Sequence, residues 1–473
     1  MSSLEKNIKF LRNFNSKNYY ENSSKVKKGS VFFSFAEDPE VSFSHAKEAK
    51  KNGASLIVSS KKINDLGVIN LVDEDIKTNK RKYLNYLFNF DTKNIIVNGV
   101  TGTNGKSSTI FFLHQLLKKT GHKSTFLSTI KQLKEDYECE ISDLTTPDTF
   151  SIYSFMERAH KNNKRFILLE VSSHAIDQER TLGIDFSNKC LTSFSPEHLD
   201  YHKTEKAYMK TKEKFISEED YSGKVVSIDN KLGRKLLNSN KNLITISTKD
   251  KRAEIFIKQD KEFFNLFTPW GTKKIQLPFF SEFMISNFLC SLGLYGLSTN
   301  SLEIDTELMT NLQTLPGRVE KIKAFETKNC YVDYAHTPEA LEKVLEEIRK
   351  EHSGEIICLF GCGGERDKKK RAKMGTIAKK NSDFQIITND NSRRENPIEI
   401  VDQILKTFNN KDNYEVILDR EKAILFGLQK LKTYTKDSVL LIAGKGHEEE
   451  QLINGKNLTF NDVKKVKENL DAF

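Results

Sequence analysis

The sequence has little of what secreted, membrane-spanning or disordered chains depend on. Of its 473 residues only eight are proline and six are cysteine, and no two cysteines form a C-x-x-C pair. This distribution argues against a disulfide scaffold and a structural zinc site. No apolar run approaches the ~18 residues that a membrane helix needs, and the first residues lack the apolar stretch of a signal peptide. We therefore expect a soluble chain in a reducing compartment, the cytoplasm.

What is present is typical of a globular protein. Hydrophobic residues make up 37% and charged residues 30% of the chain, which at roughly 150 residues per domain suggests about three domains. Basic residues outnumber acidic ones by 75 to 65, giving a net charge of +10. These charges are spread along the whole chain, and no aromatic-basic RNA-binding pattern appears. Solvated basic faces are therefore the simpler interpretation.

The chain divides into three α/β blocks. The first, 1–90, has short apolar runs on both sides of a helical stretch at 45–51. The second, 91–315, opens with an apolar strand at 95–97 and has a second at 166–169. The last block, 316–473, follows a Pro-Gly break and contains four strand-like runs separated by helical patterns. Strands that alternate with helices predict parallel, doubly wound sheets.

The strongest local signal is a glycine-rich loop between a predicted strand and a predicted helix. Its sequence, GVTGTNGKSS, begins at Gly99, six residues before Gly105 instead of the usual five. Glycines let backbone N–H groups approach phosphates, and the start of the following helix favours anions. Lys106 can bind the β- and γ-phosphates, and the Ser107 hydroxyl can ligate Mg²⁺. Glu170 ends a buried strand, where a second metal ligand is needed.

An ordered set of motifs that spans nearly the whole chain resembles the Mur ligase family of peptidoglycan synthesis, in particular its MurE type. The motifs are the loop at 102–108, EVSSH at 170–174, HLDYH at 198–202, PGR at 316–318, DYAHTP at 333–338, GCGG at 361–364 and GKGHE at 444–448.

The resemblance implies an α/β protein with the three-domain Mur ligase architecture. Residues 1–90 would form the N-terminal domain that binds the UDP substrate. Residues 91–315 would form a central P-loop, parallel-sheet ATPase domain. Residues 316–473 would form a Rossmann-like C-terminal α/β domain that binds the amino acid.

The resemblance also implies the reaction, the formation of an amide at the expense of ATP. ATP phosphorylates the γ-carboxylate of D-Glu in UDP-N-acetylmuramoyl-L-Ala-D-Glu, and the amine of a diamino acid attacks the acyl phosphate. Bringing an anionic carboxylate to a triphosphate needs Mg²⁺ and cationic side chains. The implied partners are the UDP-dipeptide and the diamino acid, bound by a monomer without nucleic acid or membrane.

By the same resemblance, catalysis depends on Lys106, Glu170, His198 and Lys212. Ser107 and Glu170 would hold one Mg²⁺, His198 would bind a second, and Lys212 would support the metal site as a carbamate derived from CO₂. The implied ATP contacts are Gly102, Thr103, Asn104, Gly105, Lys106, Ser107, Ser108, Asn287, Arg318, Asp333 and His336.

The N-terminal motif departs most from the family. Asn22-Ser23-Ser24 stands where the family has Asp-Ser-Arg, Pro196-Glu197 replaces Arg-Asp, and Ser281 replaces a common glycine. Hydroxyl, amide and guanidinium groups suit a uracil and its phosphates. The implied UDP-substrate contacts are Ser23, Thr145, Thr146, Ser172, Gln178 and Arg180.

The third block carries the residues that would choose the amino acid. Family members that use meso-diaminopimelate carry Asp-Asn-Pro-Arg, where this chain has Asp-Asn-Ser-Arg. The Arg393 guanidinium can pair with the extra carboxylate of diaminopimelate, and L-lysine would leave it unpaired. Glu448 can receive the distal ammonium. We expect diaminopimelate, with L-lysine as the alternative. The implied amino-acid contacts are Arg366, Asp390, Asn391, Ser392, Arg393, Gly444 and Glu448.

Three other functions compete with this hypothesis. A folylpolyglutamate synthase-like ligase makes amides by the same chemistry, but the diaminopimelate-like loop and the GKGHE segment argue against it. A P-loop nucleic-acid ATPase would need stacking aromatics or a basic stripe, and neither is found. A non-catalytic binding protein would have no need for the intact Lys106, Ser107, Glu170 and His198.

Overall fold

The structure is a computed structural model. It describes residues 2–14, 16, 18–64, 66–88, 94–130, 133, 137–218, 222–239, 243–260, 263–279, 281–304, 306–409 and 411–473. The chain divides into two compact units, Met1–Ile275 with Ser286–Leu308, and Gln276–Ile285 with Met309–Phe473. The predicted domain boundary near residue 90 falls in 89–93, which lies outside the described residues.

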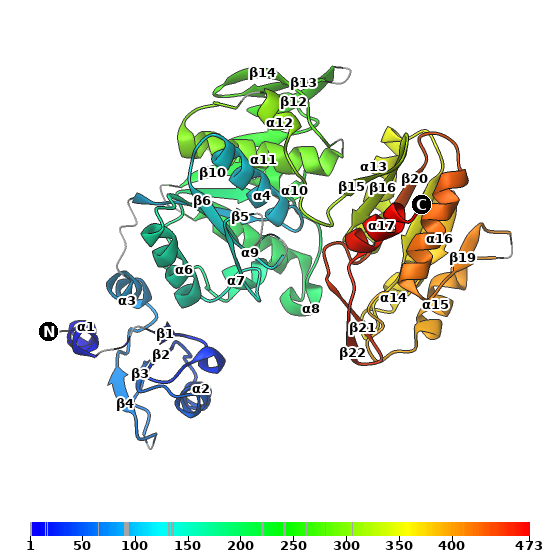
Figure 1. Cartoon of the computed structure of the whole chain (residues 1–473). Helices are drawn as coiled ribbons and strands as arrows, with labels where there is room; N and C mark the ends of the chain where they lie inside the picture. Colours follow the sequence, from blue (N-terminus) through cyan, green and yellow to red (C-terminus); the bar gives the residue numbers. More distant parts are fainter. Residues whose placement is uncertain are drawn as a thin grey trace. The chain divides into compact units, whose positions relative to one another are not determined.

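The first unit begins with a small parallel sheet, ordered β1-β2-β3-β4 (Figure 1). Asp38 starts its helix α2 by accepting hydrogen bonds from two backbone N–H groups, with a proline in the first turn. This helix confirms the prediction at 45–51. The elements are α1 (Ser3–Asn13), β1 (Tyr19–Tyr20), η1 (Ser23–Lys25), β2 (Val31–Ser34), α2 (Pro39–Lys51), β3 (Leu56–Ser59), β4 (Ile69–Val72) and α3 (Lys80–Leu87).

A ten-stranded sheet forms the main part of the first unit, in the order β14-β13-β12-β11-β10-β9-β5-β8-β6-β7. Its strands are parallel except where β13 pairs antiparallel with β12 and β14. The strands are β5 (Ile96–Thr101), β6 (Ser124–Ser128), β7 (Cys139–Ile141), β8 (Phe166–Glu170), β9 (Asn188–Leu191), β10 (Gly223–Ser227), β11 (Ile244–Ser247), β12 (Ile255–Asp260), β13 (Phe263–Thr268) and β14 (Gly271–Ile275).

Helices connect the parallel strands and cover the sheet, as βαβ units require (Figure 1). The chain passes from one unit to the other at three points, of which one follows β14 and the other two lie within α11 and α12. The helices are α4 (Lys106–Lys119), α6 (Thr149–Lys161), α7 (Ser173–Asp177), α8 (Leu199–His202), α9 (Glu205–Ser217), α10 (Lys231–Ser239), α11 (Glu282–Thr299) and α12 (Thr306–Thr310).

The small sheet packs against the large-sheet part of the same unit. The rings of Phe33 and Phe150 lie 4.9 Å apart in a shared apolar core. Glu21 connects the two parts through polar contacts, because one of its oxygens lies 2.6 Å from Lys80 Nζ and the other accepts a 2.6 Å hydrogen bond from Thr149 N. The Glu21 carboxylate therefore also satisfies the start of α6.

The second unit contains a six-stranded sheet, ordered β15-β16-β20-β17-β18-β19, with only β15 antiparallel. Apolar clusters cover both faces of the sheet, and the four predicted strand runs are confirmed as β16, β17, β18 and β20. The elements are β15 (Glu320–Phe325), β16 (Lys328–Asp333), α13 (Pro338–Glu351), β17 (Ile356–Phe360), α14 (Lys369–Asn381), β18 (Phe384–Ile387), α15 (Pro397–Ile404), η3 (Leu405–Thr407), β19 (Tyr414–Val416), α16 (Arg420–Thr433), β20 (Val439–Ala443), β21 (Glu450–Ile453), β22 (Lys456–Thr459) and α17 (Asp462–Asp471).

This arrangement places the polar motifs after the carboxyl ends of parallel strands, where ligands of open α/β sheets bind. The glycine loop follows β5, and the Glu170 motif ends the neighbouring strand β8. Among the helices of the described chain, none has the length and apolar character to cross a membrane.

Candidate active site

The glycine loop between β5 and α4 is closely packed against neighbouring segments. A Cβ atom on Gly102 would lie 2.0 Å from Thr192 Oγ1, and one on Gly105 would lie 2.1 Å from Asn287 Oδ1. Gly105 also has a φ of +91°, a conformation that L side chains rarely adopt. The structure thus brings Asn287, a predicted ATP contact, directly against the loop.

Residues after β9 hold the loop in place. Thr192 Oγ1 donates a 2.6 Å hydrogen bond to Asn104 O, and Asn104 N donates one of 2.9 Å to Ser193 Oγ. The hydroxyls of Thr103 and Tyr208 lie 3.0 Å apart. Sequence reasoning missed these supports, although their place after a buried parallel strand was an available signal.

Two lysines share one carbonyl of the loop. Lys106 Nζ donates 3.0 Å hydrogen bonds to Gly102 O and Thr103 O, and Lys212 Nζ donates one of 2.9 Å to Gly102 O. Lys212 is 1% exposed. Burial, reinforced by the charge of Lys106, lowers the pKa of the Lys212 amine well below its ordinary value. Lys212, unremarkable in sequence, is therefore a buried amine beside the loop.

The predicted metal ligands Ser107 and Glu170 are in direct contact. Ser107 Oγ donates a 2.7 Å hydrogen bond to Glu170 Oε1. A hydroxyl and a carboxylate are hard oxygen donors, and Mg²⁺ is commonly held by one or two such groups together with water and phosphate oxygens. The donor set therefore fits magnesium. In the part of the chain that is described, no three His, Cys, Asp or Glu side chains form a metal-binding group.

His198 starts α8 in a left-handed conformation, with a φ of +55°. Its ring centroid lies 4.9 Å from that of His174, and its Nε2 lies 3.6 Å from Glu197 Oε2. Glu197 replaces the family's usual Asp, so the acidic neighbour is retained with a longer side chain.

Four predicted UDP-substrate residues form one hydrogen-bonded network. Thr146 Oγ1 donates to Glu170 O at 2.8 Å and accepts from Ser172 N at 3.0 Å. Arg180 Nη1 donates to Thr146 O at 2.9 Å, and Arg180 Nε donates to Gln178 Oε1 at the same distance. The network continues into the Glu170 strand, so it connects these residues to the metal ligands.

The other two predicted UDP-substrate residues are placed differently. Thr145 is half-buried beside Thr146 in the chain. Ser23 Oγ donates a hydrogen bond to the Glu48 carboxylate, and Ser23 O accepts one from Asn52 Nδ2 at 3.0 Å. The Ser23 hydroxyl is thus engaged within the small N-terminal sheet region.

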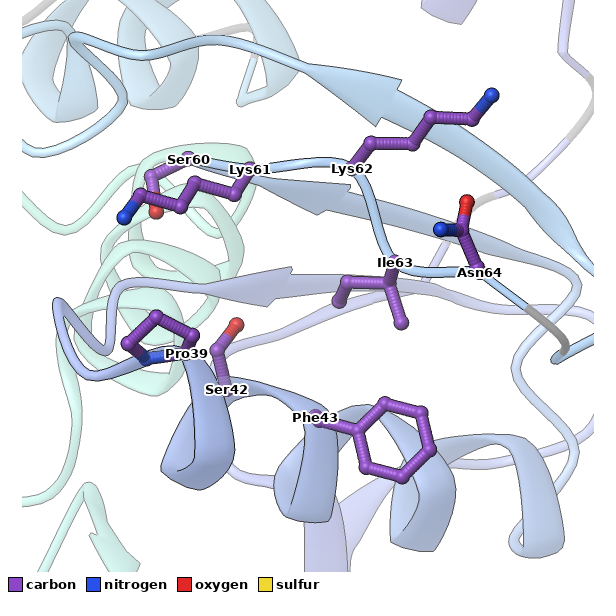
Figure 2. A pocket seen from close by; sticks show the side chains of 8 residues that line it. All are labelled: Pro39, Ser42, Phe43, Ser60, Lys61, Lys62, Ile63 and Asn64. Atoms are coloured by element: carbon purple, nitrogen blue, oxygen red, sulfur yellow. The ribbon is translucent and has the colours of Figure 1, made fainter.

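A hollow of about 270 Å³ lies in the same region, between the start of α2 and the segment after β3 (Figure 2). It contains none of the predicted UDP-substrate residues. Its lining is Pro39, Ser42, Phe43, Ser60, Lys61, Lys62, Ile63 and Asn64.

In the second unit, Asp333 ends β16 and accepts 2.8 Å hydrogen bonds from Val319 N and Ala335 N. Burial raises the pKa of the Asp333 carboxyl, while the Arg318 charge and these hydrogen bonds oppose the rise. The Arg318 guanidinium lies 4.7 Å from the centroid of Tyr334. The structure therefore brings the predicted nucleotide contacts Arg318 and Asp333 to one end of the second sheet.

The loops around this group are in close backbone contact. A Cβ atom on Gly317 would lie 2.1 Å from His447 N, and one on Gly446 would lie 2.7 Å from Gly317 O. Both glycines have positive φ, +65° and +52°. His336, the third predicted nucleotide contact here, is exposed, and its Nδ1 lies 2.9 Å from Tyr334 O.

The predicted amino-acid contacts also lie in the second unit. Arg393, with a φ of +54°, donates from Nη1 to Gly364 O at 2.6 Å and from its backbone N to Leu452 O at 2.9 Å. A Cβ atom on Gly363 would lie 3.1 Å from Arg393 Nη1 and 3.7 Å from Arg366 Cγ. The two predicted arginines therefore flank the same glycine.

The remaining amino-acid contacts meet on neighbouring loops. Asn391 Nδ2 donates a 2.8 Å hydrogen bond to Glu448 Oε2. A Cβ atom on Gly444, with a φ of +118°, would lie 2.7 Å from Asp390 Oδ2. Ser392, which stands where the family has proline, is fully buried. Their close neighbour Lys445, from the GKGHE motif, donates hydrogen bonds to Asn391 and Glu448, a role that the sequence did not predict.

The comparisons with known proteins agree with one another. Residues 100–295 match the Mur ligase middle domain, and residues 317–446 match the Mur ligase, glutamate ligase domain. A UDP-N-acetylmuramoyl-L-alanyl-D-glutamate–2,6-diaminopimelate ligase of Prochlorococcus marinus is 32% identical over 96% of this chain and 94% of its own length. The equivalent ligase of Coxiella burnetii is 34% identical over 79% and 78%.

Solved structures give the same result. The structure of a UDP-N-acetylmuramoyl-L-alanyl-D-glutamate–2,6-diaminopimelate ligase, 27% identical in sequence, superposes with a TM-score of 0.70 over 96% of this chain and 95% of its own. The MurF ligase of Thermotoga maritima in complex with ADP is 18% identical and has a TM-score of 0.59 over 96% and 97%. At that identity the second match shows the fold alone.

Proposed function

The chain belongs to the Mur ligase family, and on that premise we propose that it joins 2,6-diaminopimelate to UDP-N-acetylmuramoyl-L-alanyl-D-glutamate in peptidoglycan synthesis, using ATP. The observation that carries the proposal is the contact of Ser107 with Glu170 beside the Lys106 loop. This contact occurs in a chain that is similar to diaminopimelate ligases along nearly its full length.

Ser107 and Glu170 would hold one Mg²⁺, and His198 would bind a second. When bound, the ions supply positive charge that offsets the repulsion between the triphosphate and the substrate carboxylate. Lys106 contributes a second positive charge. Its ammonium, now bonded to the carbonyls of Gly102 and Thr103, can exchange these partners for phosphate oxygens.

The D-Glu carboxylate attacks the γ-phosphorus, ADP leaves, and an acyl phosphate forms. The diaminopimelate amine then attacks the acyl carbon, phosphate leaves with the bonding electron pair, and the amine loses a proton. The chain's main task in both steps is to hold two anions and one amine in reacting order.

Lys212 is suited to carbamylation. Its low pKa favours the neutral amine, and only the neutral amine can add to CO₂, giving a carbamate and one released proton. The product is an anion in place of a buried neutral amine, beside Lys106 at the Gly102 carbonyl. Such an anion would support the orientation of the cationic groups around the loop.

Arg180 and its network would contact the UDP-dipeptide, and Arg393 would pair with the distal carboxylate of diaminopimelate. We expect a monomer without a nucleic-acid partner. All six cysteines are free thiols, as in a reducing compartment, and we place the reaction in the cytoplasm.

The test is phosphate release from ATP with each component omitted in turn. We expect release only when the UDP-dipeptide, diaminopimelate and Mg²⁺ are all present, with the tripeptide product identified by its mass. Phosphate release that required DNA or RNA in place of these substrates would refute the proposal. A parallel series with L-lysine tests the choice of amino acid.

A further inference from the structure

Lys445 is a fully buried lysine that takes no part in the proposed chemical steps. Its side chain is 0% exposed, and its ammonium donates to Glu448 Oε2 at 2.7 Å, to Glu450 O at 2.7 Å and to Asn391 Oδ1 at 3.2 Å. An ammonium has three protons to donate, so all three are used. A buried cation with a complete set of acceptors is held in one position.

Two of these acceptors belong to residues expected to bind the amino acid. Asn391 is itself fixed, because Oδ1 accepts from Lys445 and from Leu452 N at 2.9 Å, while Nδ2 donates to Glu448 Oε2. Glu448 Oε2 thus receives two hydrogen bonds. Within the described residues, no hydrogen bond reaches Glu448 Oε1, and the Glu448 side chain remains 30% exposed.

We propose that Lys445 is a positioning residue that also sets the choice of amino acid. It holds Glu448 by one oxygen so that the other can accept the distal ammonium of the substrate. Its charge offsets that of Glu448, so that a distal ammonium alone is weakly attracted. The distal end of diaminopimelate has a carboxylate as well as an ammonium, and this carboxylate pairs with Arg393. Diaminopimelate is therefore favoured over L-lysine, which has only the ammonium.

This inference rests on the proposed function and makes a prediction of its own. Without the Lys445 charge, Glu448 loses a donor and becomes an uncompensated anion. Diaminopimelate then binds more weakly because Glu448 is no longer positioned. L-lysine suffers less, because its single distal cation meets a more negative site. Discrimination between the two amino acids should fall.

The experiment measures kcat and KM for diaminopimelate, L-lysine and the UDP-dipeptide in the intact protein and its variants. For Lys445→Met we expect the KM for diaminopimelate to rise about tenfold, as for the loss of a charged hydrogen bond, while kcat changes by less than about threefold. The KM for the UDP-dipeptide should not change. The ratio of kcat/KM between diaminopimelate and L-lysine should fall.

Lys189→Met is the matched control. Lys189 is another buried lysine, 1% exposed and 2.8 Å from the Glu218 carboxylate, and it lies on β9 in the first unit. Lys445→Arg keeps the charge and should preserve most of the discrimination. If Lys445→Met does not fold, Lys445→Gln, which keeps a donor without the charge, should show the same changes.

The possible failures are distinguishable. A wild-type protein that ligates neither amino acid would refute the proposed function. If the wild-type protein ligates diaminopimelate and the Lys445 variants have the same KM and the same discrimination as the wild type, this inference alone is refuted. An equal rise of the KM for diaminopimelate in Lys189→Met would also refute this inference, because the loss of any buried lysine would then raise that KM.

Discussion

Gly105 leaves no room for a side chain at the start of α4. A Cβ atom there would overlap Asn287, at a φ that already disfavours L residues. We expect Gly105→Ala to weaken ATP binding about tenfold or more, because the loop and Asn287 must both move. Isothermal titration with a nonhydrolysable ATP analogue measures this effect.

Gly121→Ala is the control for Gly105→Ala, because it introduces the same backbone strain without crowding a neighbouring residue. Gly121 has a similar φ of +81°, but nothing lies within 4 Å of its Cβ position. This variant should lose some stability and keep its affinity for the analogue. Equal affinity losses in the two variants would contradict the crowding argument.

Ser392 buries a hydroxyl oxygen that has no hydrogen-bond partner among the described residues. Its replacement by alanine removes an unsatisfied polar group, so we expect Ser392→Ala to raise the free energy of unfolding by about 1 kcal/mol. Urea denaturation followed by fluorescence measures the change.

The control for Ser392→Ala is the same substitution at a bonded serine. Ser382 is also buried, but its hydroxyl donates a 2.7 Å hydrogen bond to Ala378 O. Ser382→Ala should therefore lower stability, by about 1 kcal/mol. Destabilisation by both substitutions would indicate that Ser392 has a partner.

At the scale of elements, an ion pair joins helix α14 to the loop before α15, and its arginine also contacts the loop after β17. Arg371 donates to both oxygens of Glu395, at 2.7 and 2.8 Å, and to Gly363 O at 3.1 Å. The two loops carry the predicted amino-acid contacts Arg366 and Arg393. The guanidinium–carboxylate pair therefore supports their spacing, together with the hydrogen bonds that join the two loops directly, such as Gly364 N to Asn391 O at 2.9 Å.

This pair makes stability depend on pH in a defined window. The Arg371 guanidinium lowers the pKa of the Glu395 carboxyl from 4.5 to about 2. Because the folded pKa is the lower one, the stabilisation is complete above pH 4.5 and is lost as the pH falls toward 2. The stability difference between wild type and Glu395→Gln should narrow across that window.

Denaturation curves at a series of pH values test this prediction. The control is Glu399→Gln. Glu399 is an exposed glutamate on α15, four residues after Glu395, and its substitution should change stability by less than ~0.5 kcal/mol. A wild-type advantage over Glu395→Gln that persisted unchanged at pH 2 would contradict the assignment.

At the scale of the whole molecule, the second unit is not one continuous stretch of chain. Its segment Gln276–Ile285 precedes part of the first unit in sequence. In this segment Phe283 packs against the core of the second unit, with Lys343 Nζ 5.3 Å from its ring centroid, and Glu282 N donates to Glu347 Oε2 at 2.7 Å. The segment is therefore part of that unit's folded structure.

We expect Phe283→Ala to destabilise the second unit by about 2 kcal/mol, because the substitution removes the apolar surface that the half-buried Phe283 ring buries against the core. Amide hydrogen exchange should speed up in α13 and stay unchanged in β5. Phe263, an exposed phenylalanine on β13, supplies the control, since Phe263→Ala should leave both regions as they were. Unchanged exchange in α13 would show that the segment is dispensable.

The sequence predicted those parallel strands that are continuous apolar runs buried on both faces, such as 166–169 and 439–443. It did not predict the parallel strands β6, β9, β10 and β11, in which polar residues interrupt the apolar run. It did not predict the antiparallel β13 and β14, whose half-exposed residues have no such run. In the site, adjacent strand ends account for the contact of Ser107 with Glu170. The burial of Lys212 and Lys445 had no sequence signal, because lysine is ordinarily exposed.

The facing loops of Gly317 and Gly446 constrain how this lineage can vary. Each backbone fills the volume that a methyl group on the other would require. Enlarging either residue alone forces the two segments apart, so no single mutational step leads away from this pair. Randomised libraries should recover glycine at both sites.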